Sequence, residues 1–243
     1  MTERPLIVNA EMVRAILDGR KTQTRRIIQS PARNMQATGK KVIDYREPGD
    51  KWYGEYIFSM RNQSGTWCDY TKEQFLAKCP FGAVGDRLWV RETWSDVNSE
   101  GCPAVAYRAD SDTRLLAEIE TFRDEDGVLN TADPRLDKYW FAAWSGDLFS
   151  GTEGSWRPSI HMPRWASRIT LEITGVRVER LASISSDDAR AEGYPAARAA
   201  DGGNIDPWLW FRDLWDGIYP EQSFKANPWV WVVEFKRVEG GSA

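Results

Sequence analysis

Apolar residues recur along this chain with two different spacings, and each spacing predicts a different kind of element. Apolar residues at helical spacing mark two segments, which are 9–19 and 206–220, and a cap residue, acids in the first turn and a closing glycine mark a third, 185–193. Alternation of apolar and other residues marks three β-strands, which are 85–94, 167–181 and 227–238. Since short helices separate these strands in place of crossover helices of regular length, the order disfavours a doubly wound parallel sheet. It favours an α+β fold, built as a small, mainly antiparallel β-barrel with short flanking helices.

The ends of the predicted helices carry capping signals. Asn9 and Ser185 each precede a helical segment and offer a side-chain oxygen to the first backbone amides. Asp206 stands at the cap of the third helix, with Pro207 at its first helical position. Gly19 follows the first helix and adopts a left-handed conformation without a Cβ penalty. These signals predict where the helices begin and end.

Two long segments interrupt this order of elements. Residues 29–78 and 95–153 show little regular periodicity and are rich in Gly, Asp and aromatic residues. Loops of that length inside a compact domain are usually functional. We expect a single domain over 1–243 with two insertions, which form a lid or wall over the mouth of the barrel and widen the range of substrates accepted.

Composition and charge narrow the class of protein. The chain has 243 residues, of which 42% are hydrophobic, and it contains 13 Trp, so a globular core is expected. The runs "PWLWF" and "PWVWVVEF" are assigned to that core. Three widely spaced cysteines and one histidine, His161, indicate neither a disulfide framework nor a metal site. The net charge of −4 argues against a protein that binds nucleic acid through a bulk positive field.

Local charge and hydropathy add two expectations. Cations are concentrated in residues 1–26 and again in "WRPSIHMPRWASR", and each cluster is either a solvated face or a phosphate contact. No apolar run approaches the roughly 20 residues of a membrane span, and the N-terminus lacks the apolar core of a signal peptide. The sequence therefore predicts a cytoplasmic protein with no membrane partner.

Several motifs occur together in a recognisable order. These are "ILDGRKTQTRR" after a helix, "GDRLWV", "ARAEG", "DGIYP" and the terminal "WVWVVEFKRV". In this order they resemble the ASCH domains, which are relatives of the PUA RNA-binding fold. The resemblance covers about half of the chain and leaves both insertions outside it. "CPFGAVGDRLWVRETW" and "RPSIHMPRWASRI" also resemble the longer ASCH proteins that prophages often carry.

This resemblance implies a PUA-like barrel and a specific chemistry. Small ASCH enzymes of similar pattern hydrolyse the amide of N4-acylcytidines, such as N4-acetylcytidine, with a lysine, a threonine and a glutamate and with no cofactor or metal. By position in the motifs these residues are Lys21, Thr24 and Glu192. The implied substrate is a small modified nucleoside.

The three residue types suit metal-free amide hydrolysis. Such a reaction needs a nucleophile, a proton acceptor for it and a proton donor for the departing amine. Thr24 is the candidate nucleophile. Either Lys21 or Glu192 is the candidate base, since a lysine with an ordinary pKa near 10.4 is almost entirely protonated at pH 7. Nearby arginines would lower the lysine pKa and Glu192 would raise it, so the assignment stays open.

Strand geometry sets a condition on this site. Lys21 and Thr24 are separated by an odd number of residues, so a regular strand would point them to opposite faces. A shared site requires a turn or bulge at residues 21–23. The candidate substrate-binding residues around it are Arg20, Arg26, Trp89 and His161. Trp89 and Trp94 are the candidates for stacking on a base.

Two other functions remain open at this stage. One is a PUA-like RNA- or DNA-binding module in which Lys21, Arg25, Arg26 and the arginines of 157–168 contact phosphates. The other is an ASCH-type ribonuclease that uses the same cations. The acidic net charge and the retained threonine favour the amidohydrolase.

Overall fold

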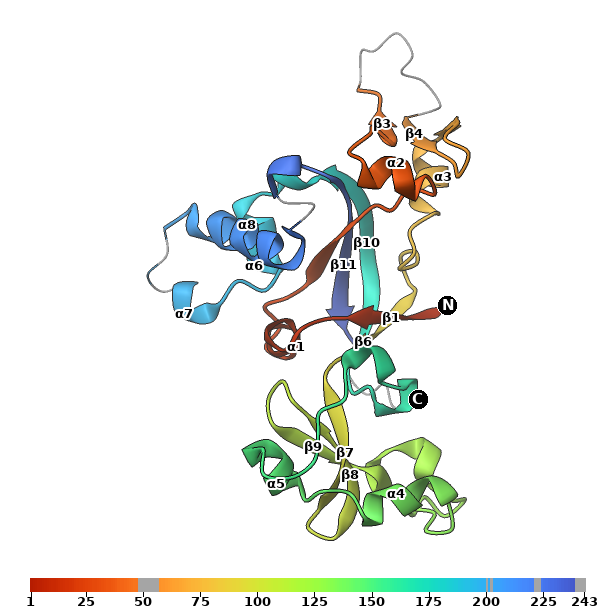
Figure 1. Cartoon of the computed structure of the whole chain (residues 1–243), viewed down its shortest axis with the longest axis vertical. Coiled ribbons are helices and arrows are strands. Elements are labelled where there is room, and N and C mark those ends of the chain that lie inside the picture. The colour runs from red at the N-terminus through yellow and green to blue at the C-terminus, as the bar shows by residue number, and fades with distance from the viewer. Residues whose placement is uncertain (48–56, 200, 202, 221–223, 239–243) are drawn as a thin grey trace. The chain divides into compact units, whose positions relative to one another are not determined.

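The structure is a computed structural model that describes residues 1–47, 57–199, 201, 203–220 and 224–238 (Figure 1). The described residues divide into two compact units. Unit 1 comprises residues 1–20, 87–172 and 236–238. Unit 2 comprises the described residues of 21–86 and 173–235. Strand β10 (Thr170–Arg180) begins in unit 1 and continues into unit 2.

Unit 1 contains two groups of strands. Strand β1 (Glu3–Ile7) pairs in parallel with β6 (Arg87–Arg91), and the first residues of β10 pair antiparallel with β6. A separate antiparallel sheet is formed by β7 (Trp94–Ser99), β8 (Cys102–Tyr107) and β9 (Asp112–Leu115). Its α-helices are α1 (Ala10–Leu17), α4 (Asp137–Trp140) and α5 (Ser145–Ser150).

Unit 2 also contains two groups of strands. Strand β2 (Gln23–Ile27) pairs antiparallel with β11 (Trp229–Arg237). A small antiparallel sheet is formed by β3 (Ile43–Tyr45), β4 (Phe58–Arg61) and β5 (Trp67–Tyr70). Its α-helices are α2 (Arg33–Ala37), α3 (Lys72–Leu76), α6 (Ser186–Ala191), α7 (Ala196–Ala199) and α8 (Asp206–Ile218).

The mixed α+β class and the mainly antiparallel pairing are confirmed. Hydrogen-bonded neighbours in the largest sheet follow the order β1-β6-β10-β11-β2. Over the described residues this order has β1 and β2 at its two ends, and no ladder joins them, so the expected closed barrel is not formed by hydrogen bonds. Closure of a sheet requires such a ladder between its first and last strands.

Both long insertions are more regular than their sequences indicate. Within 29–78 lie the three strands of the β3-β4-β5 sheet, and within 95–153 lie most of those of the β7-β8-β9 sheet. These strands have only 3 to 6 residues, which is too short to produce a clear periodic signal. Part of the first insertion, 48–56, lies outside the described residues. The prediction of irregular loops was wrong for the remainder.

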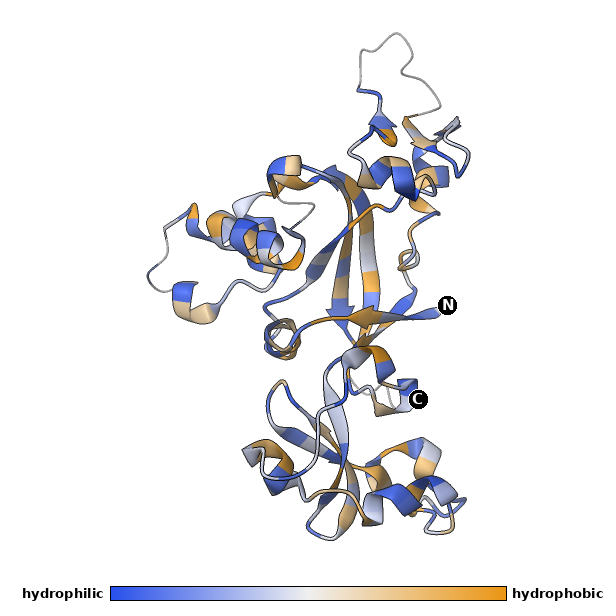
Figure 2. Cartoon of the chain, viewed as in Figure 1, coloured by the Kyte–Doolittle hydropathy of each residue, from blue (hydrophilic) through white to orange (hydrophobic). Residues whose placement is uncertain are grey.

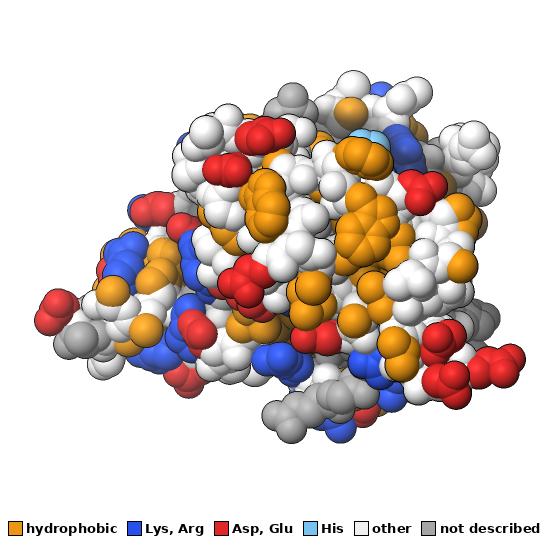
Figure 3. All heavy atoms as spheres, turned by 90° about the horizontal axis from the view of Figure 1, so that it is seen from below, with side chains coloured by type: hydrophobic (Ala, Val, Ile, Leu, Met, Phe, Trp, Pro, Cys, Tyr) orange, Lys and Arg blue, Asp and Glu red, His pale blue; other side chains and the backbone are white. Residues whose placement is uncertain are grey.

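The core of unit 1 is rich in aromatic residues. Tyr107, Phe122 and Tyr139 are buried in it, and Trp165 packs edge-on against Phe122 with ring centroids 5.0 Å apart. Trp94 belongs to the same cluster and is only 3% exposed, so it is not available to stack on a base. Three of the large apolar side chains that stay exposed lie in or beside α4 and α5, and they are Trp140, Phe141 and Trp144. Figure 3 shows apolar and charged side chains intermixed on one face of the molecule.

The core of unit 2 confirms the assignment of both tryptophan-rich runs to the interior. Phe211 and Trp215 of α8 pack in one cluster with Val230 and Val232 of β11. Figure 2 shows hydrophobic and hydrophilic residues along this strand. Ile218, the last residue of α8, is 42% exposed and lies outside this cluster.

Most capping predictions are confirmed. Met12 N donates to Asn9 Oδ1 at 2.9 Å, and Asp188 N donates to Ser185 Oγ at 3.0 Å. Gly19 has the left-handed φ of +74° that its position after α1 requires. Asp206 was expected to cap α8 but is its first residue, and its carboxylate instead accepts hydrogen bonds from Arg198 and Tyr194. None of the described helices is long and apolar enough to cross a membrane.

Candidate functional site

The centre of the candidate site is a buried contact between two residues that are 171 positions apart. Lys21 lies just before β2 and forms an isolated antiparallel β-bridge with Glu192, the C-cap residue of α6. Lys21 Nζ donates to Glu192 Oε2 at 2.8 Å. The side chains of Lys21 and Glu192 are 0% and 3% exposed. The structure therefore brings together two of the three predicted catalytic residues.

Lys21 has the hydrogen-bond environment of an ammonium group. Besides the carboxylate, Nζ donates to the Glu192 carbonyl at 2.9 Å and to the Gln23 carbonyl at 2.8 Å. Three acceptors match the three N–H groups of a protonated lysine. Burial nevertheless lowers the pKa of Lys21, and the positive charges of Arg26 and Arg25 lower it further, while Glu192 opposes the shift. Lys21 therefore loses its proton more readily than an exposed lysine does.

Arg25 completes the cation pair around the Glu192 carboxylate. Its side chain is fully buried, and NH1 donates to Glu192 Oε1 at 3.1 Å. Its other terminal nitrogen lies 3.2 Å from Glu179 Oε2 and 3.3 Å from Asp188 Oδ2. The two oxygens of Glu192 are thus held by two different cations, which fixes the carboxylate in place.

A second arginine extends this network and was missed at the sequence level. Arg177 of β10 contacts Glu179 at 2.5 Å, Asp188 at 3.0 Å and the Glu234 carboxylate. Burial raises the pKa of Asp188, but the Gln23 hydrogen bond and the charges of Arg25 and Arg177 outweigh it, so the net shift is downward. The available signal was the alternation in β10, which places Arg177 and Glu179 on one strand face.

Thr24 lies on the other face of β2. It is fully buried and pairs with Val233 across the sheet, whereas Arg25 pairs with Val232. Thr24 Oγ1 accepts a hydrogen bond from Arg26 NH1 at 2.8 Å. Thr22 is not part of a strand, so the backbone between Lys21 and β2 is irregular, which is the condition that a shared site of Lys21 and Thr24 requires. The side-chain contacts nevertheless join Lys21 to Glu192 and Thr24 to Arg26, so the predicted catalytic set is divided into two pairs.

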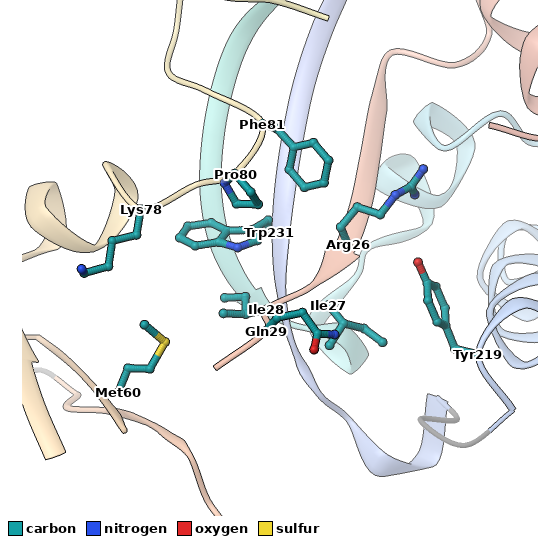
Figure 4. Close-up of a pocket in the computed structure, with 10 residues that line it drawn as sticks. All are labelled: Arg26, Ile27, Ile28, Gln29, Met60, Lys78, Pro80, Phe81, Tyr219 and Trp231. Carbon is teal, nitrogen blue, oxygen red and sulfur yellow. The ribbon is translucent and has the colours of Figure 1, made fainter. Parts of the chain in front are cut away.

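Arg26 connects the Thr24 pair to a pocket of about 370 Å³. The lining residues come from five segments of unit 2 and are Arg26, Ile27, Ile28, Gln29, Met60, Lys78, Pro80, Phe81, Tyr219 and Trp231. Figure 4 shows Trp231 and Pro80 between Arg26 and Tyr219 on one side and Lys78 and Met60 on the other. The first insertion supplies Met60 and Lys78 to this lining.

The other predicted substrate-binding residues belong to unit 1. Arg20 pairs with Asp18 at 2.9 Å. Trp89 of β6 lies within 5.3 Å of the Arg91 guanidinium carbon and 6.0 Å of that of Arg164. His161 is exposed at the end of the 3₁₀ helix Ser159–His161. Lys21, Thr24, Glu192 and Arg26 belong instead to unit 2.

The second basic stretch of the sequence is held by carboxylates of unit 1. Arg157 pairs with Asp96, and Arg164 pairs with Glu3 at 2.9 Å. Arg168 contacts Glu92 at 3.0 Å and, at 2.8 and 3.0 Å, the carboxylates of Asp110 and Asp112. Burial raises the pKa of Glu92, and the Arg168 contact opposes that shift. These cations stabilise the unit internally.

Comparison with known proteins adds no family assignment. No protein-family model matches the chain, and neither a curated protein nor a solved structure is significantly similar to it. The resemblance to ASCH domains therefore rests on the sequence motifs alone. Among the residues described, no group of three or more His, Cys, Asp or Glu side chains is placed to hold a metal ion.

Proposed function

We propose that this protein is an ASCH-like, PUA-related amidohydrolase that cleaves the N4-acyl amide of acylated cytosine nucleosides to the nucleoside and a carboxylate. The observation that carries the proposal is the buried 2.8 Å contact between Lys21 Nζ and Glu192 Oε2. The motifs that resemble ASCH domains contain both residues, and a buried titratable group with a perturbed pKa, such as Lys21, is typical of catalytic sites. The proposed setting is the cytoplasm.

The proposed reaction begins at Thr24. Its Oγ attacks the acyl carbon, the C–N4 bond breaks, and N4 takes up a proton as the nucleoside leaves. Water then hydrolyses the threonine ester to a carboxylate. Arg26 NH1, 2.8 Å from Thr24 Oγ1, supplies a fixed positive charge beside the reacting oxygen. Arg26 cannot serve as the base, because a guanidinium group does not lose its proton in proteins.

In the proposed reaction the proton from Thr24 passes to the Lys21–Glu192 pair through an intervening water, because Thr24 contacts Arg26 and not this pair in the structure. Lys21 can act as the base only in its neutral form, and the lowered pKa of Lys21 increases the population of that form. If Lys21 is the base, activity rises with pH through the lysine pKa.

The pattern of ion pairs favours this reaction over binding or cleavage of nucleic acid. Lys21 and Arg25 have fully buried side chains, and Arg157, Arg164 and Arg168 are paired with carboxylates. Phosphate contacts require cations that can reach the nucleic-acid backbone. These five of the cations named for that function are therefore poorly placed to contact a phosphate backbone.

Hydrolysis of N4-acetylcytidine, followed by ultraviolet absorbance with EDTA present, tests the proposal. Thr24→Val keeps the shape of the side chain and removes the hydroxyl, so kcat/KM is expected to fall by at least about 10³-fold. Thr24→Ser retains a hydroxyl and is the matched control, expected to keep activity within about tenfold of wild type.

Two results would overturn the proposal. One is a folded wild-type protein that leaves every N4-acylcytidine intact. The other is a Thr24→Val variant that is as active as wild type, which would remove Thr24 from the reaction.

A further inference from the structure

We infer that the 370 Å³ pocket beside Arg26 holds the acyl group of the substrate, and that the preferred acyl group is therefore bulky and apolar, larger than acetyl. This inference rests on the proposed function. It concerns the size and polarity of the acyl group, which the sequence motifs do not indicate.

The position of the pocket comes from strand geometry. Thr24, Arg26 and Ile28 alternate along one face of β2 and its extension, and Trp231 lies opposite Arg26 in the paired strand β11. Arg26 both lines the pocket and donates to Thr24 Oγ1. An acyl carbon at the Thr24 oxygen would thus place its substituent on the face of the sheet where the pocket lies.

The lining of the pocket suits a hydrocarbon. Ile28, Met60, Pro80, Phe81 and Trp231 all contribute to its wall (Figure 4). Ile28, Met60 and Trp231 are at most 7% exposed, so the wall is built on core residues. An apolar wall gains free energy by excluding water from an apolar group and gains nothing from a polar one.

The size of the pocket exceeds what an acetyl group needs. Acetyl adds a single methyl group to the reacting carbonyl, whereas a volume of about 370 Å³ is within the range of pockets that hold whole small ligands. A short acyl group would leave most of this volume to water. A longer one would replace that water with contacts to the wall.

The test is a series of N4-acylcytidines with acetyl, butyryl, hexanoyl and benzoyl groups. Each methylene buried in the pocket is expected to raise kcat/KM about 3- to 4-fold, until the pocket is filled. Phe81→Ala removes part of the wall from a half-buried loop position, and Met60→Trp fills the pocket. Both substitutions are expected to reduce the hexanoyl-to-acetyl ratio of kcat/KM by at least about fivefold.

Met35→Trp is the matched control, because Met35 is a partly exposed residue of α2 that does not line this pocket. It is expected to leave the ratio unchanged. A ratio that is flat or falls with chain length in an active wild type overturns the inference and leaves the proposed function intact. If no substrate is hydrolysed, calorimetric titration with N4-hexanoylcytidine and with cytidine tests, independently of the proposed reaction, whether the pocket binds the acyl group. Tighter binding of the hexanoyl compound that Phe81→Ala weakens supports the pocket, and equal binding of both overturns it.

Discussion

The Glu192 carboxylate lies between two cations, with Lys21 on one oxygen and Arg25 on the other. All three side chains are almost completely buried. Removing one member of a buried ion pair leaves an uncompensated charge, whereas removing both members is tolerated better. At the scale of single residues, this cluster therefore has a structural role in addition to its proposed part in catalysis.

A double-mutant cycle measures that structural role. Lys21→Met and Glu192→Gln are each expected to lower the free energy of unfolding by about 3–5 kcal/mol, and the double variant by clearly less than the sum. Urea denaturation gives these values. Lys41→Met is the control, because Lys41 Nζ also lies 2.7 Å from a carboxylate, that of Asp44, but the lysine side chain is 60% exposed. It is expected to change stability by less than about 1 kcal/mol. Strictly additive losses at Lys21 and Glu192 would contradict the pairing.

The lowered pKa of Asp188 leads to a prediction of how the free energy of unfolding depends on pH. The folded state lowers the pKa of Asp188 below its ordinary value of 3.8, so its carboxylate stabilises the protein above that pH. This contribution is lost as pH falls through the lowered folded-state pKa. Asp188→Asn is therefore expected to be less stable than wild type at neutral pH, with the difference shrinking below pH 3.8.

Asp187→Asn is the control for that measurement, because the Asp187 side chain is 92% exposed. Its stability is expected to follow the wild-type pH curve in urea titrations between neutrality and pH 2. A difference between Asp188→Asn and wild type that persists unchanged at acidic pH would remove Asp188 from the titrating groups.

At the scale of elements, the C-terminal end of α6 positions Glu192, and the N-terminal end is fixed by its cap. Ser185 Oγ accepts the hydrogen bond from Asp188 N, and Asp188 itself contacts Arg25. A short helix of 6 residues has little stability of its own and depends on such contacts.

Ser185→Ala is expected to lower the free energy of unfolding by about 1 kcal/mol, because it removes the cap acceptor. Amide hydrogen exchange at Asp188 should increase in the same variant. Ser183→Ala, at an exposed position two residues earlier, serves as the control and is expected to change neither quantity. Equal behaviour of the two variants would show that the cap does not stabilise α6.

Strand β2 explains why the sequence motif indicated the candidate residues but did not predict which of their side chains contact one another. The motif "GRKTQTRR" indicated Lys21, Thr24 and Arg26, but side chains alternate between two faces once β2 begins at Gln23. Arg25 consequently joins the ion network with Glu192, and Thr24 joins Arg26 at the pocket. The face that each residue occupies follows from the residue at which the strand starts.

At the scale of the whole molecule, charge is distributed unevenly along the chain. The net charge is −4, and residues 95–153 contain 13 Asp and Glu against 5 Lys and Arg. In unit 1 the arginines of 157–168 are each paired with carboxylates. The acidic balance of residues 95–153 and the pairing of these arginines disfavour contacts with a phosphate backbone.

We therefore expect only weak binding to single-stranded RNA, with a Kd above about 10⁻⁶ M at physiological salt. Fluorescence anisotropy with a labelled oligonucleotide measures it. Tight binding that weakens steeply with added salt would contradict this expectation and would favour the nucleic-acid-binding function. Arg212→Gln, a substitution of a half-exposed arginine that pairs with Asp213, provides a baseline for the loss of one surface charge.

The sequence by itself determined the α+β class, the helix caps at Asn9 and Ser185, the core position of the tryptophan-rich runs and the identity of Lys21 and Glu192 as a candidate pair. The class, the caps and the core follow from local spacing and capping chemistry, which act over a few residues, whereas Lys21 and Glu192 were indicated by the resemblance of the motifs to ASCH domains. Only the tertiary structure decided which side chains meet. The Lys21–Glu192 contact joins residues 171 positions apart. Arg177 of β10 contacts Asp188 and so joins the ion-pair network around Glu192. The residues that line the pocket come from separate segments of unit 2. Such contacts depend on strand register and on the path of the chain between elements, which no local pattern encodes.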